Sequence, residues 1–509
     1  MKLQQLLQGL AEYREHEDHH VSGLSLNTQH IQPGELFIAL KGHQHDGRTY
    51  IKEAISRGAS AIICEAQGLE AFHYVASREM PIIPVSNLAS KLSTLASRFY
   101  DKPSAAMKVI GITGTNGKTT SSFLLSQSLS RLNIPCAVLG TLGYGFLHSL
   151  SHSALTTPDA LSLQRHLKEL KDQGAEAVAM EVSSHGLAQD RVSSIEFCSA
   201  IFTNLTQDHL DYHGNMEAYG QAKQKLFQFP SLKRAIINAD SDYYPKIMRV
   251  IRRDIPIILH TVQSKLSAVP SQRSSLLAIT LKQLDLDQKG ITAVVETPWG
   301  QGILRSPLLG MFNVSNLLGV LAELCLQGAD LKNALAALSQ SYPPPGRMQR
   351  LGGITTPQVI IDYAHTPDAL ENALKAARKH CRRRLWCVFG CGGDRDKDKR
   401  AKMGHIAGLY ADRIVITNDN PRTENPRSII DGILEGLSAE HHDKIFVEED
   451  RQSAIEHAIS RALAVDTILV AGKGHEDYQI IGDQKFPFSD VECVKTLLKE
   501  DNNEAINYR

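Results

Sequence analysis

Residues 109–132 constrain the fold of this chain more than any other stretch. Residues 109–113 are small and apolar and predict a buried strand, a glycine-rich turn follows at 114–117, and residues 121–132 have the pattern of a helix. A strand, a tight loop and a helix in this order bind phosphate, because backbone N–H groups and the helix dipole attract an anion. Lys118 would reach the β- and γ-phosphates of a nucleotide, and the Thr119 hydroxyl would hold Mg²⁺.

The loop differs from the strict pattern Gly-x4-Gly-Lys-[Ser/Thr] at its first position. Ile112 stands where the pattern has glycine, and Gly111 and Gly114 lie on either side of that place. The alternative is a glycine-rich turn with an incidental lysine, but it does not explain the strand before the turn and the helix after it. We therefore expect a nucleotide phosphate site made of Gly114, Thr115, Asn116, Gly117, Lys118, Thr119 and Thr120.

Charge and cysteine usage argue against several classes of protein. The 55 Lys and Arg residues balance the 55 Asp and Glu residues, so nothing indicates non-specific binding to nucleic acid or to a membrane surface. Residues 1–8 lack the apolar core of a signal peptide, and no apolar run approaches the ~18 residues of a membrane span. The eight cysteines form no Cys-x-x-Cys pair, which favours a cytoplasmic protein with reduced thiols over a zinc or disulfide framework.

The alternation of strand and helix patterns divides the 509 residues into three α/β regions. Residues 1–100 mix short strands with helices and predict a small mixed α/β domain. Residues 101–340 have the pattern of a doubly wound, mostly parallel sheet, with a small antiparallel sheet added at 275–309. The proline run within 342–346 predicts a hinge, and residues 341–509 form a further, Rossmann-like α/β region.

Polar residues follow several predicted strands, which is where open α/β sheets bind their ligands. Glu181 could hold Mg²⁺ through a hard oxygen ligand, although a carboxylate can also cap the next turn. Residues 202–214 contain two histidines and two aspartates within six positions, which favours a metal or catalytic role over a structural one. Arg347 could bring positive charge to a transferred phosphoryl group. Lys223 lies on a predicted helix, and its position alone gives it no role.

The last region carries two arginines and an acid at the ends of its strands. Arg395 and Arg422 suit a carboxylate, which a planar guanidinium can hold with two hydrogen bonds, and Glu476 could receive an ammonium group. Together they predict a pocket for an amino acid with an extra carboxylate, and surface salt bridges are the alternative. In the first region, the polar loop at 41–48 is a candidate ligand contact, whereas the histidine-rich residues 16–20 are typical of a solvated loop.

With these motifs in place, the chain resembles the Mur ligases, ATP-dependent enzymes that form amide bonds in bacterial cell-wall synthesis. The motifs that carry the resemblance are Gly114-Thr115-Asn116-Gly117-Lys118-Thr119-Thr120, Glu181-Val182-Ser183-Ser184-His185, Asn204 with Asp208-His209-Leu210-Asp211-Tyr212-His213, Asn313-Val314-Ser315-Asn316, Pro345-Gly346-Arg347-Met348 and Asp362-Tyr363-Ala364-His365. They occur in order across nearly the whole chain. The resemblance implies three domains, in which residues 1–100 bind a UDP-sugar, residues 101–340 bind ATP and residues 341–509 bind the incoming amino acid.

The resemblance also implies which member of the family the chain is closest to. Asp419-Asn420-Pro421-Arg422 is similar to the signature of members that use meso-2,6-diaminopimelate, and lysine-adding members lack the arginine. Such members join the amino acid to the D-glutamate of UDP-N-acetylmuramoyl-L-Ala-D-Glu. The carboxylate is first activated by ATP as an acyl phosphate, and the amine then displaces phosphate. We therefore expect a cytoplasmic monomer whose partners are these small molecules, with no nucleic acid and no membrane span.

Individual residues take roles from the resemblance. The residues expected to act in catalysis are Lys118, Lys223, His209 and Glu181. The expected ligands of two Mg²⁺ ions are Thr119, Glu181, His209 and Lys223, the last as a carbamate formed with CO₂. Further contacts to ATP are expected from Asn313, Asn316, Arg347 and Asp362. The UDP-N-acetylmuramoyl dipeptide would be held by Leu26, Thr28, His43, Gln44, His45, Thr156, Thr157, Ser183, Gln189 and Arg191. Diaminopimelate would be held by Arg395, Asp419, Asn420, Pro421, Arg422, Gly472 and Glu476.

One motif departs from the family, and alternatives stay open. The family usually has Asp-Ser-Arg where this chain has Asn27-Thr28-Gln29, so Thr28 keeps a hydroxyl while the charged pair on either side of it is absent. A lysine-adding ligase is disfavoured by Arg395 and Arg422, and a folylpolyglutamate-forming ligase by the sizeable first domain. A nucleotide-dependent regulatory protein would need the phosphate loop without the acid, histidine and arginine sets that follow it.

Overall fold

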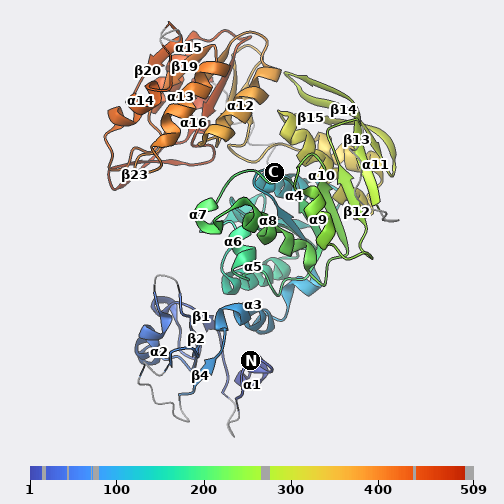
Figure 1. Ribbon diagram of the computed structural model, residues 1–509, viewed down its shortest axis with the longest axis vertical. Helices are drawn as coiled ribbons and strands as arrows, with labels where there is room; N and C mark the ends of the chain where they lie inside the picture. Colours follow the sequence, from blue (N-terminus) through green and yellow to red (C-terminus); the bar gives the residue numbers. More distant parts are fainter. Residues whose placement is uncertain are drawn as a thin grey trace. The chain divides into compact units, whose positions relative to one another are not determined.

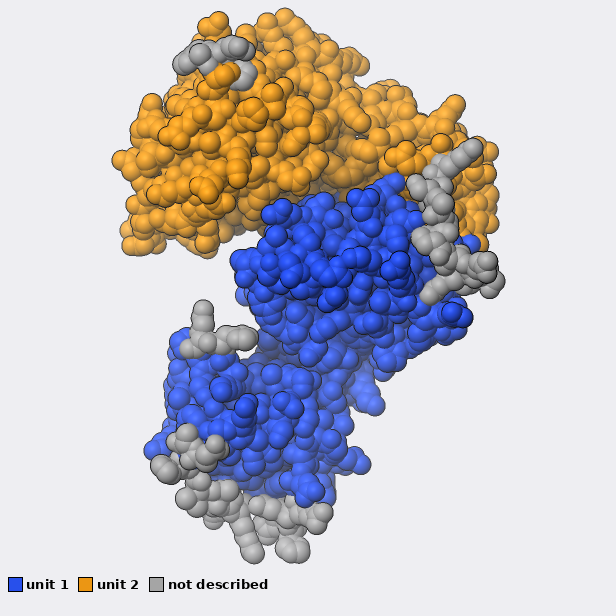
Figure 2. Space-filling model, viewed as in Figure 1, with its two compact units in different colours: residues 1–122, 133–258, 270–276 blue, residues 123–132, 259–269, 277–509 orange. Residues whose placement is uncertain are grey.

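The computed structural model describes residues 1–13, 19–42, 45–69, 72, 80–264, 276–438 and 443–498 (Figure 1). The chain forms two compact units, coloured separately in Figure 2. The first unit comprises Met1–Ser122, Asn133–Ile258 and Pro270–Leu276. The second unit comprises Phe123–Leu132, Leu259–Val269 and Leu277–Arg509. Among the described residues, no helix is both long enough and apolar enough to cross a membrane.

The first unit begins with a four-stranded parallel sheet in the order β1-β2-β3-β4. Alternate residues of a strand point to opposite faces, and here both faces are buried. Leu36 and Ile38 of β2 join a core with α1 and α3, whereas Phe37 and Ala39 pack with α2. The elements are α1 (Leu3–Leu7), β1 (Leu24–Ser25), η1 (Thr28–His30), β2 (Leu36–Ala39), η2 (Gly47–Tyr50), α2 (Ile51–Ser56), β3 (Ala61–Glu65), β4 (Ile82–Val85), α3 (Leu88–Phe99) and η4 (Pro103–Ala106).

The second sheet of this unit carries the phosphate loop. Within this unit its strands lie in the order β12-β11-β10-β5-β9-β6-β7-β8, with β11 to β6 parallel and β7 and β8 antiparallel. The chain continues from β5 to β6 on one side of the sheet and from β10 to β11 on the other, and ligands bind at the carboxyl ends of strands at such a switch point. The elements are β5 (Lys108–Thr113), α4 (Lys118–Arg131), β6 (Cys136–Gly140), β7 (Gly143–Phe146), β8 (Ser149–Ser151), α5 (Ala160–Asp172), β9 (Ala177–Glu181), α6 (Ser184–Ala188), β10 (Phe197–Phe202), α7 (Leu210–His213), α8 (Met216–Gln224), η5 (Lys225–Gln228), β11 (Arg234–Asn238), α9 (Tyr244–Val250) and β12 (Ile257–His260). Of α4 only the residues up to Ser122, and of β12 only those up to Ile258, belong to the first unit.

The second unit contains an antiparallel meander and a mostly parallel sheet. The meander is β13 (Leu276–Asp287), β14 (Gly290–Thr297) and β15 (Gly300–Ser306), followed by α10 (Met311–Leu326) and α11 (Leu331–Ser339). The larger sheet has the order β16-β17-β21-β18-β19-β20, in which only β16 is antiparallel. Its strands are β16 (Gln349–Gly352), β17 (Gln358–Asp362), β18 (Leu385–Phe389), β19 (Arg413–Ile416), β20 (Ile445–Val447) and β21 (Thr467–Ala471).

Helices cover both faces of this larger sheet, because neighbouring residues of each strand are buried on opposite sides. Cys387 and Phe389 of β18 pack with α12 (Pro367–His380), α13 (Asp398–Tyr410) and α14 (Pro426–Leu434). Trp386 and Val388 pack with α15 (Arg451–Arg461) and α16 (Asp490–Leu498). A two-stranded hairpin, β22 (Tyr478–Ile481) and β23 (Gln484–Pro487), precedes α16.

The predicted fold class is confirmed, including the mostly parallel sheet and the added antiparallel strands. The sequence pattern of residues 331–339 predicts a helix, which matches α11 to the residue, and α4 begins at Lys118, three residues before the predicted start. The pattern of residues 49–57 also predicts a helix, which is wrong at its start, because η2 occupies Gly47–Tyr50 before α2 begins. The structure adds short strands that the sequence pattern did not predict, among them β7, β8, β15, β22 and β23. The three predicted domain boundaries stay a prediction.

Candidate active site

The predicted phosphate loop joins β5 to α4 in the first unit. Gly117 has a positive φ of 86°, a conformation that glycine adopts without strain. Gly114 is needed for a different reason: a Cβ there would lie 1.9 Å from Oγ1 of Thr203. The loop therefore requires both glycines, one for its turn and one for its close approach to β10.

Asn204 holds the loop in shape from the end of β10. Its side-chain oxygen accepts a hydrogen bond from Asn116 N at 2.9 Å, and its side-chain nitrogen donates to Asn116 O at 3.1 Å. Its backbone oxygen accepts from Thr115 N at 3.0 Å. Three hydrogen bonds from one residue thus fix the loop backbone.

Two lysines share one carbonyl of the loop. Lys118 Nζ and Lys223 Nζ donate to the oxygen of Gly114 at 2.8 Å and 2.9 Å. Lys223, on α8, is only 1% exposed, and its ammonium lies 4.3 Å from the centre of the Tyr219 ring. Burial and the positive charge of Lys118 hold the pKa of Lys223 well below its usual value. Lys223 therefore lies against the phosphate loop in a setting that favours its neutral amine.

Glu181 at the end of β9 is buried beside the start of α4. Its Oε2 accepts hydrogen bonds from the hydroxyls of Thr119 at 2.9 Å and Thr141 at 3.1 Å, and its Oε1 accepts from Thr141 N at 2.9 Å. Gly140 makes room for this carboxylate, because a Cβ there would lie 2.1 Å from Oε1. The two residues predicted to serve Mg²⁺, Thr119 and Glu181, are thus in direct contact.

His209, the third predicted metal ligand, lies in a cluster of aromatic rings. Its side chain is 47% exposed, and its ring centre lies 4.8 Å from that of His185. His213 lies 5.4 Å from His185 and is hydrogen-bonded to Ser184 Oγ at 3.0 Å. Across the described residues, no three His, Cys, Asp or Glu side chains converge as a ready metal site. The predicted set of Thr119, Glu181, His209 and Lys223 contains only two side chains of these types, so it stays a prediction.

The residues predicted to hold the dipeptide form one hydrogen-bonded chain that leads to Glu181. Thr157 Oγ1 donates to the Glu181 backbone oxygen at 3.0 Å and accepts from Ser183 N at 3.0 Å. Arg191 donates to Thr157 O at 2.7 Å and to Gln189 Oε1 at 2.9 Å. Thr156 joins the same group, with its hydroxyl 3.1 Å from that of Thr141.

The predicted UDP contacts in the N-terminal sheet are only partly described. His43 and Gln44 lie outside the described residues. Thr28 is 5% exposed and donates its hydroxyl to Glu53 Oε2 at 2.9 Å, Leu26 is half-buried, and His45 is exposed. The Thr28 hydroxyl proton is therefore already used within the protein.

The predicted ATP contacts of the second unit form two groups. Asn313 and Asn316 are buried on α10, where Asn316 donates to Asn313 Oδ1 at 3.1 Å. In the other group, Asp362 accepts hydrogen bonds from the backbone N–H of Met348 at 2.8 Å and of Ala364 at 3.0 Å. The Arg347 guanidinium lies 4.7 Å from the centre of the Tyr363 ring.

The predicted amino-acid residues gather at the carboxyl ends of β18, β19 and β21. Asn420 donates to Glu476 Oε2 at 2.9 Å, and a Cβ at Gly472 would lie 2.8 Å from Asp419 Oδ2. Arg422 has a φ of 52° and donates to Gly393 O at 2.8 Å. Pro421 is buried beside it. Its backbone oxygen lies close to Gly393, where an added Cβ would be 1.9 Å from it. Arg395 is exposed near Gly392, whose Cβ would lie 3.7 Å from its Cγ.

Sequence reasoning missed three side chains that organise these groups. Thr141 holds Glu181. The buried ammonium of Lys473 contacts Asn420 and Glu476. Arg451 donates to the backbone of Asn418 and Ala471. The position of Lys473 between two glycines at a strand end was the one signal that could have identified it.

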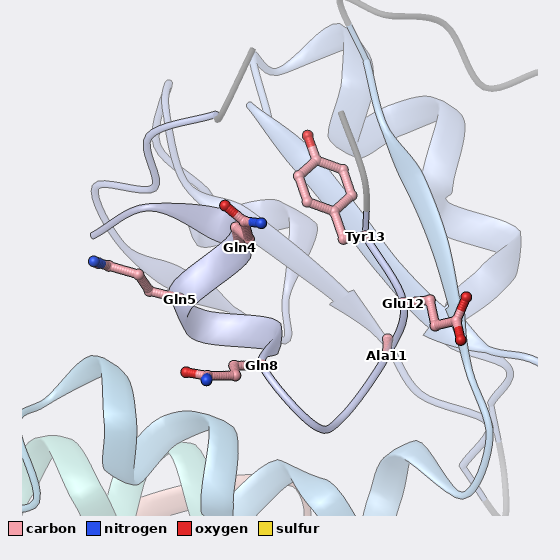
Figure 3. Close-up of a pocket in the computed structure, with 6 residues that line it drawn as sticks. All are labelled: Gln4, Gln5, Gln8, Ala11, Glu12 and Tyr13. Carbon is pink, nitrogen blue, oxygen red and sulfur yellow. The ribbon is translucent and has the colours of Figure 1, made fainter. Parts of the chain in front are cut away.

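A cavity of about 450 Å³ lies away from these groups, at α1 in the first unit (Figure 3). It is lined by Gln4, Gln5, Gln8, Ala11, Glu12 and Tyr13. None of the predicted site residues lines it.

Comparison with known proteins places the chain in a family. Three family models match it: the Mur ligase middle domain over residues 112–324, the Mur ligase glutamate ligase domain over residues 346–474, and the Mur ligase family catalytic domain over residues 20–100. The UDP-N-acetylmuramoyl-L-alanyl-D-glutamate–2,6-diaminopimelate ligase of Coxiella burnetii is 46% identical over 94% of this chain and 96% of its own length. The enzyme of the same name from Pseudomonas aeruginosa is 46% identical over 93% and 94%.

A solved structure agrees with these relatives. A UDP-N-acetylmuramoyl-L-alanyl-D-glutamate–2,6-diaminopimelate ligase structure superposes with a TM-score of 0.72 at 33% identity, covering 98% of this chain and 99% of that one. Identity at this level over almost the full length of both chains reflects common descent rather than a shared fold alone. The chain belongs to the Mur ligase family.

Proposed function

We propose that this protein is the ATP-dependent ligase that joins meso-2,6-diaminopimelate to the D-glutamate of UDP-N-acetylmuramoyl-L-Ala-D-Glu. The observation that carries this proposal is the 46% identity, over 94% of the chain, to a ligase named for that reaction. The phosphate loop and the arginine and acid groups described above agree with it. The chemistry divides into activation of a carboxylate and attack by an amine.

Activation needs stabilisation of the charge on the transferred phosphoryl group. Lys118 lies at the loop and can turn its ammonium from the carbonyls of Gly114 and Thr115 to the phosphates of ATP. The loop N–H groups and the start of α4 provide further positive potential for the phosphates. The γ-phosphoryl group passes to the D-glutamate carboxylate, and the resulting acyl phosphate has a good leaving group where the carboxylate had none.

Mg²⁺ fits the donors beside the loop. Thr119 and Glu181 present a hydroxyl and a buried carboxylate in contact at 2.9 Å, and Mg²⁺ prefers one or two such oxygen ligands together with substrate phosphates. When bound, the ion would neutralise phosphate charge during transfer. Thr141 would keep the carboxylate oriented through its two hydrogen bonds.

Lys223 is suited to become a carbamate, which is the modification that the resemblance of the chain to the family implies. Only a neutral amine attacks CO₂, and the buried setting of Lys223 favours that form. Carbamylation would replace a cation close to Lys118 with an anion, so that repulsion between two lysines becomes attraction. The carbamate oxygens, with His209, would then offer ligands for a second Mg²⁺.

The second unit would hold the amino acid. Arg422 and Arg395 would bind a carboxylate of diaminopimelate, and Glu476 would receive an ammonium group. L-Lysine lacks the second carboxylate, so it would leave an arginine of the site without its partner. A monomer in the cytoplasm, with the N-terminal sheet holding the UDP group, completes the proposal.

The direct test measures phosphate release from ATP with Mg²⁺ and UDP-N-acetylmuramoyl-L-Ala-D-Glu. Release should require meso-diaminopimelate and should hardly respond to L-lysine. The variant Arg422→Met should raise KM for diaminopimelate and reduce discrimination against L-lysine, whereas Arg427→Met, at an exposed position on α14, should change neither.

Three results would contradict the proposal. Equal turnover with L-lysine would identify a lysine-adding enzyme, and activity with a folate and glutamate would identify a folylpolyglutamate-forming one. ATP binding without any amino-acid-dependent phosphate release would indicate a regulatory protein.

A further inference from the structure

A lysine with no assigned role lies at the centre of the amino-acid group. Lys473 follows β21 between Gly472 and Gly474, and its side chain is 0% exposed. Both glycines have positive φ, of 118° and 55°, and a Cβ at Gly474 would lie 2.7 Å from Cβ of Tyr363. The glycines on either side let the backbone turn so that the lysine points inward, where a solvated lysine would point out.

The Lys473 ammonium is fully used by protein partners. It donates to Asn420 Oδ1 at 3.0 Å and to Glu476 Oε2 at 3.2 Å, and it lies 3.5 Å from Asp419 Oδ1. An ammonium has three protons, and three oxygens surround this one. Asp419 Oδ1 is buried and accepts no hydrogen bond from a described residue, so the lysine is its nearest source of positive charge. Two of the three ammonium protons are thus donated to Asn420 and Glu476, and the Asp419 carboxylate lies within ion-pair distance of the ammonium.

These contacts leave one oxygen of Glu476 available. Its Oε2 accepts from both Lys473 and Asn420, while its Oε1 accepts no hydrogen bond from any residue in the described part of the chain. The Glu476 side chain is 18% exposed, so this oxygen can be reached by a small molecule. One side of the carboxylate is fixed by the protein, and the other is oriented for a ligand.

The charges of the three groups add to one negative charge. Asp419 and Glu476 carry one negative charge each, and Lys473 carries one positive charge between them. A site with a single net negative charge can receive one ammonium group. Without Lys473, two carboxylates would face each other at short range, and one of them would take up a proton instead of binding the ammonium.

We propose that Lys473 is a positioning residue that orients Glu476 and sets the charge of the site so that it accepts one ammonium group of the amino-acid substrate. The inference rests on the proposed function and deepens it, because it explains how the acidic residues of the site stay ionised side by side. Lys473 acts through Glu476 and Asn420, and it does not touch the substrate.

Other charged and titratable groups around this trio would stay in place in a variant. Those that act on Glu476, Asp419 or their neighbours are Arg347, Tyr363, His365, Cys391, Arg422, Arg451, His475, Asp477 and Tyr478. A change at Lys473 alone thus alters one charge against a constant background.

The test compares the pH profile of kcat/KM for diaminopimelate in the wild type and in Lys473→Met. Loss of the cation removes an attraction that favours ionised carboxylates at this site, so the acid limb should move upward by about 1–3 pH units. KM for diaminopimelate should rise about 10- to 100-fold through loss of a charged hydrogen bond. KM for ATP should change by less than about twofold, because the phosphate loop is a separate site.

A second variant protects the test against a folding failure. Asp419→Asn removes the other carboxylate and keeps the cation, so it should move the acid limb in the opposite direction, to lower pH. In the double variant Lys473→Met/Asp419→Asn, the limb should return toward its wild-type position. An unmoved acid limb in both single variants would overturn the proposal, as would a rise in KM for diaminopimelate and ATP alike.

The wild-type enzyme separates this inference from the proposed function. If it releases phosphate with L-lysine and not with diaminopimelate, the proposed function fails, and the same comparison of acid limbs is made with lysine. If it uses diaminopimelate while the variants keep the wild-type profile, the role of Lys473 fails and the proposed function stands.

Discussion

Replacing Arg451 by methionine should destabilise the second unit strongly. Arg451 begins α15 and Asp490 begins α16, and both side chains are 0% exposed. Their two hydrogen bonds measure 2.7 Å and 2.8 Å, and the guanidinium also donates to Asn418 O at 3.2 Å and Ala471 O at 3.0 Å. Methionine keeps an apolar stem of similar length but leaves a buried carboxylate and two carbonyls without these donors.

The expected loss is about 3–5 kcal/mol in the free energy of unfolding, which is typical when one partner of a buried ion pair is removed. Adding the four bonds separately, at about 1.5–3 kcal/mol each, would give roughly twice that value. The smaller figure is preferred because groups that share one side chain are not additive. A loss of this size is a large fraction of the stability of an ordinary domain.

Tryptophan fluorescence during urea unfolding reports on this unit alone. The chain has two tryptophans, Trp299 and Trp386, and both belong to the second unit. Trp386 is 6% exposed on β18, so its emission should change when the sheet unfolds. Arg461→Met is the matched control, because Arg461 is exposed at the other end of α15, and its loss should change stability by less than about 0.5 kcal/mol.

The double variant Arg451→Met/Asp490→Leu decides whether charge is the cause. Removing both charges leaves no buried ion without a partner, so the double variant should recover at least about half of the loss. The reasoning is refuted if Arg451→Met costs less than about 1 kcal/mol, or if the double variant is no more stable than the single one.

Three further predictions concern other parts of the chain. Glu181→Gln should lower kcat about 100-fold and raise the Mg²⁺ concentration needed for half-maximal phosphate release, because a carboxylate ligand is lost. Gly346→Ala should lower the free energy of unfolding by more than about 2 kcal/mol, because φ is 66° and the new Cβ would lie 2.1 Å from a backbone carbon. Gly482→Ala is the control: its φ is 59° but its Cβ would meet open space, so it should lower that free energy by only about 1 kcal/mol in the same urea assay. The hydrogen-bonded Arg400 lowers the pKa of Glu424 from 4.5 to about 2. The pair therefore stabilises the fold fully above pH 4.5, and this stability is lost as the pH falls toward 2. Glu424→Gln should lower the free energy of unfolding of the second unit at pH 7 by about 2 kcal/mol and make it depend less on pH in the acid range.

Much of the fold could be predicted from local patterns. Apolar runs such as 385–389 and 467–471 are β18 and β21 to the residue, because strands buried on both faces have no polar positions to blur their limits. The parallel topology then brings the ends of these strands together, so the polar loops after them were expected to share a site. Strands as short as β7 and β22 have only four residues each, too few to show a periodic pattern, and their pairing depends on neighbours that are not visible in a local window.

The site could be predicted at the level of loops but not of all side chains. Glu181 and Glu476 were found because they belong to polar motifs that follow predicted strands, where open α/β sheets bind their ligands. Thr141 and Lys473 were missed because a threonine and a lysine in a glycine-rich loop have the same appearance whether they face solvent or fix a carboxylate. Their roles arise from burial and from contacts with distant residues.

Lys223 and Lys473 are both buried, but the charges around them have opposite signs. Both are fully buried lysines, yet Lys223 faces a second cation, Lys118, while Lys473 faces two carboxylates. The first setting drives the amine toward its neutral and reactive form, and the second pairs the ammonium with carboxylates. A buried lysine therefore becomes a site of chemistry or a structural charge according to the sign of its neighbours. For Lys223 that sign comes from Lys118, which is distant in the sequence, and for Lys473 it comes from the nearby Glu476 and the distant Asp419, so a local sequence window shows at most part of it.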